Sequence, residues 1–201
     1  MNKACLSLLR ALLFALTCLA LTSCTSATPQ VTYYSLAGTD AAKPATQRHD
    51  QLVLSIGPVA LPDVLKKNQI AVDGADGRYK LSDYHRWAGG VDRDFARAIA
   101  EQLANRLGTE KISLYPADHY SQPTDQILFD ILAMDGILGK EANLAVRWSL
   151  VDPKSKSARI TRRSTFSEQP ADGSYDAWIL SQRHNISRLS EEIASAIKAA
   201  H

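Results

Sequence analysis

The sequence is poor in cysteine, in long apolar runs and in net charge. Three cysteines, Cys5, Cys18 and Cys24, are all that its 201 residues contain, so a disulfide framework after residue 24 is excluded. No apolar run reaches the ~18 residues of a membrane-spanning helix, which argues against a polytopic membrane protein. Lys3 and Arg10 precede Cys24, and without them basic and acidic residues are equal in number. Because phosphate contacts need an excess of basic residues, no nucleic-acid partner is predicted.

Motifs for metal binding and catalysis are also missing. The five histidines, His49, His85, His119, His184 and His201, show none of the spacings found in zinc sites, so no metal site is predicted. The sequence has no G-x-S-x-G nucleophile elbow and no glycine-rich loop that ends in Lys-Ser or Lys-Thr. We therefore predict a protein that is not an enzyme and that uses no cofactor.

Carboxylates are the catalytic groups that the sequence leaves open, because the distances between them in space do not show in the chain. Asp130 stands out, since it lies within an apolar segment that reads as a strand. We interpret Asp130 as part of the solvent face of that strand, and His85 as a packing or surface residue. An envelope hydrolase stays open as an alternative function on these grounds.

The first 23 residues are typical of an export signal, with Lys3 and Arg10 near the start and an apolar stretch over 11–21. Residues 21–24, Leu-Thr-Ser-Cys, resemble the bacterial lipobox, in which the cysteine is lipidated and becomes the first residue of the mature chain. We predict that Cys24 carries the lipid and that residues 24–30 form a polar tether. Thr25 follows the cysteine where an inner-membrane lipoprotein would carry Asp, which favours the outer membrane.

Periodicity in the rest of the chain predicts strands and two helices. Every fourth residue is apolar over 91–107, and a similar stripe runs from Ser174 to the C-terminus, so both segments are expected to be amphipathic helices. Alternation over three segments joined by short links predicts an antiparallel meander. We expect one α+β domain over 31–201, a mainly antiparallel sheet with the two helices packed on one face. The predicted strands are 31–36, 51–59, 69–72, 78–82, 111–115, 127–133, 143–150 and 158–166.

Three segments carry a family resemblance. They are Tyr-Tyr-Ser-Leu at 33–36, the stretch from Ile56 to Ile70 that contains Gly-Pro-Val-Ala-Leu-Pro, and Arg-Trp-Ala at 86–88 before the first helix. In this order they resemble the PqiC/YmbA-type lipoproteins, which are ABC-type transport auxiliary lipoproteins. The order of elements through the C-terminal helix also fits, so the resemblance spans most of the mature chain.

The resemblance implies a lipoprotein on the periplasmic face of the outer membrane. It would dock the periplasmic end of an MCE-type intermembrane lipid transporter and support envelope integrity. Its implied partners are an MCE-domain periplasmic protein and an inner-membrane transporter component, and it implies that a homo-oligomeric ring can form. A small lipid-binding lipoprotein is a further alternative.

The prolines around residue 60 point to a partner-docking surface. Because proline fixes the φ angle, the two Pro-containing dipeptides are expected to hold the chain rigidly between a strand and a turn. Apolar side chains nearby are then able to form a docking patch, although the same pattern fits a corner of the core equally well. The predicted docking residues are Pro58, Leu61, Pro62, Leu65, Gln69 and Trp87.

Overall fold

The structure, a computed structural model, describes residues 29–38, 51–73, 77–116 and 122–200. Val31–His201 cluster into one compact unit, separate from Met1–Gln30. The predicted signal peptide and Cys24 lie outside the described residues, so the lipidation site and the segment boundaries stay predictions. Within the described ranges, no helix is both long and apolar enough to cross a membrane.

The larger sheet consists of β2 (Leu54–Ala60), β5 (Ile112–Leu114), β6 (Asp125–Asp135), β7 (Ala142–Val151) and β8 (Ala158–Glu168). Its strand order is β5-β2-β6-β7-β8. The long strands β6, β7 and β8 pair antiparallel in sequence order because short turns connect them. β2 runs parallel to both of its neighbours, β5 and β6.

A smaller sheet consists of β1 (Thr32–Tyr34), β3 (Gln69–Val72) and β4 (Lys80–Trp87), in the order β1-β4-β3. β3 and β4 pair antiparallel, and β1 lies parallel to β4. The short 3₁₀ helix η1 (Asp63–Lys66) connects β2 to β3.

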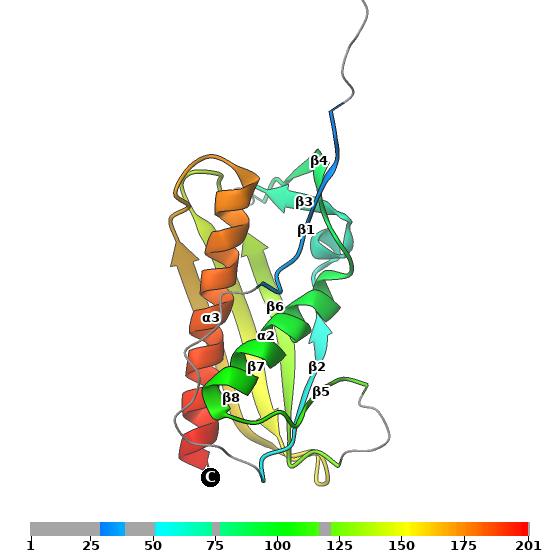
Figure 1. Cartoon of the computed structure of the whole chain (residues 1–201), viewed down its shortest axis with the longest axis vertical. Helices are drawn as coiled ribbons and strands as arrows, with labels where there is room; N and C mark the ends of the chain where they lie inside the picture. Colours follow the sequence, from blue (N-terminus) through cyan, green and yellow to red (C-terminus); the bar gives the residue numbers. More distant parts are fainter. Residues whose placement is uncertain (1–28, 39–50, 74–76, 117–121, 201) are drawn as a thin grey trace, which may run out of the picture. The chain divides into compact units, whose positions relative to one another are not determined.

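Two helices cover one face of the larger sheet (Figure 1). α2 (Val91–Leu107) packs on β2 and β5, α3 (Tyr175–Ala200) packs on β7 and β8, and the helices also contact each other. Gly108 ends α2 in the left-handed conformation, with φ of 63°, as its position predicts. Ser174 begins α3 as an N-cap, because its Oγ accepts a hydrogen bond from the Ala177 N–H at 3.1 Å.

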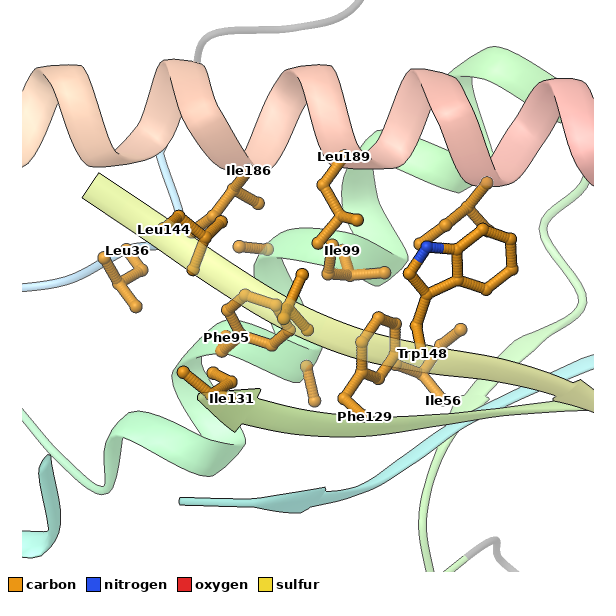
Figure 2. Close-up of a cluster of buried hydrophobic side chains, with 14 of the residues drawn as sticks. Leu36, Ile56, Phe95, Ile99, Phe129, Ile131, Leu144, Trp148, Ile186 and Leu189 are labelled. Atoms are coloured by element: carbon orange, nitrogen blue, oxygen red, sulfur yellow. The ribbon is translucent and has the colours of Figure 1, made fainter. Parts of the chain in front are cut away.

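The core lies between the helices and the larger sheet. Figure 2 shows Phe95, Phe129 and Trp148 beneath Ile186 and Leu189 of α3. The rings of Phe95 and Phe129 meet edge to face, with centroids 5.4 Å apart. These side chains are almost completely buried, so the apolar stripes that predicted the helices are the surfaces that join them to the sheet.

The predicted fold class is confirmed, and so is the three-stranded meander of β6, β7 and β8. Except for β3, the strands differ from their predicted bounds by one or more residues, and β4 differs most. β4 continues to Trp87 instead of ending near residue 82, because β1 pairs with its last residues. β1 itself spans only 32–34 of the predicted 31–36.

Candidate docking site beside helix α2

Two adjoining hollows open beside the first turns of α2. The larger has a volume of about 860 Å³ and is lined by α2, by the end of β2 and by β5. The smaller, of about 370 Å³, is lined by the start of α2 and by the segment from Val59 to Asn68. Val59 and Asp92 line both hollows, so we treat them as one surface and call it the α2 groove.

A bulge in β2 shapes the larger hollow. The pairing of β2 with β6 shifts register between Ile56 and Val59, which pushes the Gly57-Pro58 pair out of the ladder. Gly57 has a φ of 103°, a conformation that L side chains rarely adopt, and an added Cβ would lie 3.3 Å from Cβ of Tyr115. The amide of Gln126 donates a hydrogen bond of 2.9 Å to the Gly57 carbonyl, which holds the bulge against β6.

The lining of the larger hollow combines apolar and cationic side chains. Ile56 and Ala96 are buried beneath it, and Ile112 and Leu114 of β5 are half-buried at its side. Arg93 and Arg97 line it from α2, one helical turn apart and both exposed. Neither arginine forms an ion pair with another described residue. The hollow therefore offers an apolar surface beside two guanidinium groups that are available to an acidic ligand.

The smaller hollow is cationic on the side of η1. Lys66 pairs with Asp63 at 2.8 Å, and this contact lowers the pKa of the Asp63 carboxyl. Lys67 is exposed and makes no ion pair within the described ranges. Asp92 is the acidic side chain in the lining of both hollows. Basic groups thus outnumber acidic ones around the groove.

The six predicted docking residues separate into three groups. Pro58 is exposed in the larger hollow, and Leu61 is half-buried in the smaller one. Leu65 also lines the smaller hollow but is only 2% exposed, and Trp87 is 4% exposed within the core. The half-buried residues Pro62 and Gln69 lie outside both linings. Docking through these residues stays a prediction, and the burial of Leu65 and Trp87 does not favour direct contact of these two side chains with a partner.

The sequence analysis did not identify Arg93 and Arg97, which lie on the exposed face of the helix predicted over 91–107, as part of a groove. The signal in the sequence is weak, because two arginines four residues apart are common on exposed helix faces. Tyr115 was also missed, since its place beside Gly57 depends on the parallel pairing of β5 with β2. That pairing joins segments more than 50 residues apart in the chain.

Two titratable residues that the sequence singled out, His85 and Asp130, have structural partners outside the groove. His85 accepts or donates a 3.0 Å hydrogen bond with the Tyr34 hydroxyl and stacks on Tyr175, with ring centroids 4.0 Å apart. Asp130 pairs with Arg147 at 3.3 Å on the sheet face away from the helices, in agreement with its interpretation as a solvent-face residue. In the part of the chain that the structure describes, no three His, Cys, Asp or Glu side chains gather as a metal site would require.

Solved structures share this fold. One uncharacterized protein is 18% identical with a TM-score of 0.67, and the match covers 84% of this chain and 99% of that one. A Xanthomonas campestris protein of the DUF330 family is 13% identical with a TM-score of 0.66, covering 82% and 93%. No curated protein matches the sequence. At these identities the likeness establishes the fold alone, an α+β fold that this chain shares with both proteins.

A family model described as the ABC-type transport auxiliary lipoprotein component matches residues 34–194. Because this match covers most of the chain, the protein belongs to the ABC-type transport auxiliary lipoprotein family. The resemblance seen in the sequence is thereby confirmed. The matched residues include α2, every strand of the larger sheet, and α3 as far as residue 194.

Proposed function

We propose that this protein is an outer-membrane lipoprotein of an MCE-type intermembrane lipid-transport system. In this role Cys24 holds it to the membrane, and the α2 groove captures the periplasmic end of the transporter. Family membership supports a role auxiliary to ABC-type transport. The observation that carries the docking role is the groove itself, whose lining includes the Gly57-Pro58 bulge and the leucines of the Ile56–Ile70 segment.

The chemistry of the groove defines the partner segment that would fit it. Ile112 and Leu114 provide apolar contacts, while Arg93 and Arg97 attract negative charge. β5 is the end strand of its sheet, so it also has an outer edge on which a further strand can pair. An extended segment of an MCE-domain protein that carries apolar and acidic side chains satisfies all three features.

Charge reversal tests this docking role. We expect the double substitution Arg93→Glu and Arg97→Glu to reduce co-purification of the MCE-domain protein from native membranes several-fold, because the reversed charges repel an acidic segment. The matched control is Arg163→Glu, an exposed arginine on β8 that lies outside the groove. Equal recovery of the partner with both variants would contradict docking at the α2 groove.

Crosslinking provides the direct test of the partner. A photoreactive residue at Pro58, which is exposed in the larger hollow, is expected to crosslink to the MCE-domain protein in intact cells. The same residue placed at Arg163 is expected to give no such product. Repeated failure to recover any MCE-domain protein from the Pro58 position would count against the proposed system as a whole.

The lipid anchor is tested separately. Each buried methylene of an acyl chain contributes about 0.8 kcal/mol to membrane binding, so several chains hold a protein essentially permanently. We expect Cys24→Ser to move the protein from the outer-membrane fraction to the soluble periplasmic fraction. Mass spectrometry of the wild-type N-terminal peptide checks the lipid itself, and unchanged retention of the variant in membranes would refute the anchor.

The size of the larger hollow favours one alternative, a lipoprotein that itself binds a small lipid. Its volume of about 860 Å³ is within the usual range of ligand sites, and its lining joins apolar side chains to two arginines. Native mass spectrometry of protein purified from membranes distinguishes the two functions. A lipid retained by the wild type and lost with Arg93→Glu and Arg97→Glu would favour the alternative.

A further inference from the structure

The small sheet exposes aromatic side chains immediately after the tether. Tyr33 of β1 is 62% exposed and Tyr84 of β4 is 45% exposed. Tyr33 is the register partner of Arg86, and Tyr84 precedes Arg86 by two residues, so the two exposed tyrosines belong to nearby positions of paired strands. Tyr34 and its register partner Trp87 are buried. These two side chains therefore join the small sheet to the core, while Tyr33 and Tyr84 present two tyrosine rings to the surroundings.

The covalent chain limits how far this surface can lie from the lipid. β1 begins at Thr32, eight residues after Cys24. Even a fully extended chain of eight residues spans only about 28 Å. The edge strand of the small sheet is thus the first element of the folded unit that the anchor reaches.

Helix α3 shows which part of the unit is remote from the anchor. Tyr175 in its first turn stacks on His85 of β4, so this end of α3 lies beside the small sheet (Figure 1). The helix has 26 residues and ends at Ala200. At a rise of 1.5 Å per residue its far end is about 39 Å away along the axis, beyond the reach of the tether.

We propose that the exposed surface of the small sheet around Tyr33 and Tyr84 lies against the bilayer in which the Cys24 lipid is inserted. Tyrosine suits this position, because its ring is apolar enough for the acyl boundary and its hydroxyl hydrogen-bonds in the headgroup region. The inference rests on the proposed anchoring function. It adds an orientation to the anchor, with the small sheet on the membrane and the end of α3 directed into the periplasm.

Chemical nitration of the native tyrosines tests the orientation without altering the fold. The lipidated full-length protein is reconstituted in vesicles of phosphatidylethanolamine and phosphatidylglycerol, nitrated, and analysed by peptide mass spectrometry. Tyr33 and Tyr84 are expected to react several-fold more slowly than in the soluble Cys24→Ser protein. Tyr115, which is 53% exposed at the far side of the α2 groove, is the internal control and is expected to react equally in both.

Each outcome of the nitration experiment decides the question. Slow nitration of Tyr33 and Tyr84 in vesicles alone supports the membrane contact. Slow nitration in the soluble Cys24→Ser protein as well would assign this surface to a protein–protein contact and overturn the proposal. Equal nitration of vesicle-bound and soluble protein would overturn it while leaving the anchor intact. If mass spectrometry finds no lipid on Cys24, the anchoring function and this inference fail together.

Discussion

Asp135 has the most unusual surroundings of the described carboxylates. It ends β6, where burial raises the pKa of its carboxyl and the nearby charge of Glu141 raises it further. Hydrogen bonds from Asn143 and Tyr79 act in the opposite direction but do not cancel the effect of burial. The main-chain carbonyl of Asp135 also accepts a 3.1 Å hydrogen bond from Gln182 of α3. The ionised form of the Asp135 carboxyl is therefore less favourable in the folded protein than in water, at a point where the sheet and α3 meet.

The raised pKa of Asp135 predicts how stability depends on pH. The folded state holds the Asp135 proton more tightly than the unfolded state does. This protonation therefore contributes fully to the free energy of unfolding below the unfolded pKa near 3.8, and the contribution is lost as pH rises through the folded pKa. We expect Asp135→Asn to be more stable than the wild type at neutral pH and to lose that advantage toward pH 3.5. Urea unfolding at both pH values measures this difference. A constant difference at the two pH values would contradict the assigned cause.

At the scale of elements, the β6–β7 connection depends on glycine and on amides from α3. Gly136 has a φ of 131°, and an added Cβ would collide with the carbonyl oxygen of Glu141. Gln182 donates hydrogen bonds of 3.1 Å to the carbonyls of Asp135 and Asn143, and Asn185 donates one of 2.9 Å to the Ala142 carbonyl. Buried amides thus fasten the end of this hairpin to the helix, which fixes the sheet beneath α3.

Substitution in this turn is expected to be costly. Gly136→Ala must strain the backbone and displace Glu141, and we expect it to lower the free energy of unfolding by about 3 kcal/mol. Gly89→Ala is the matched control, because nothing lies within 4 Å of its added Cβ and its φ is ordinary. We expect that control to change stability by less than about 0.5 kcal/mol. Denaturant unfolding of both variants compares them directly, and similar losses would show that the turn is able to relax.

At the scale of the whole unit, one buried indole connects the sheet to α3. Trp148 is fully buried on β7, and its N–H donates a 3.2 Å hydrogen bond to Ser164 of β8. The Ser164 hydroxyl in turn donates to Glu192 of α3 at 2.9 Å. Arg162, within 3.9 Å of the same carboxylate, lies 5.9 Å from the indole ring centre. Figure 2 shows Trp148 packed among the buried apolar side chains, so this residue combines apolar packing with the polar contacts to β8 and α3.

Loss of this side chain is expected to weaken the unit as a whole. Trp148→Ala leaves a large cavity and removes the N–H that donates to Ser164. We therefore expect the free energy of unfolding to fall by about 3–5 kcal/mol. The control is Leu180→Ala on α3, where the side chain is 41% exposed. That control is expected to lose less than about 1 kcal/mol. Coincident loss of the near-UV and far-UV circular dichroism signals in Trp148→Ala would show that both helices and the sheet unfold together; separate transitions would contradict this.

Assembly is a second property of the whole unit. The family resemblance implies that a homo-oligomeric ring can form, and light scattering of the Cys24→Ser protein measures its mass in solution. We expect a mass several times that of one chain. A monomer at micromolar concentrations would contradict a stable ring that forms without the membrane.

Local signals in the sequence predicted much of the fold. The apolar stripe of α2, its Gly108 end and the Ser174 start of α3 depend on residues within a few positions of one another, as does the alternation of β6, β7 and β8. The meander followed because short links force neighbouring strands to pair antiparallel. The family resemblance over Ile56–Ile70 was recognisable without the structure because its residues are contiguous in the sequence.

Contacts between distant segments were decided by the tertiary structure alone. The parallel pairings of β1 with β4 and of β2 with β5 bring together residues more than 50 positions apart, and no local pattern encodes which strands meet. Those pairings bury Trp87, put Tyr115 beside Gly57 and so help to shape the α2 groove that Arg93 and Arg97 line. The sequence by itself determined the helices, most of the strands and the family, because each of these depends on residues that are close together in the chain. The groove and the exposed tyrosine surface arise only when the folded chain brings remote residues together.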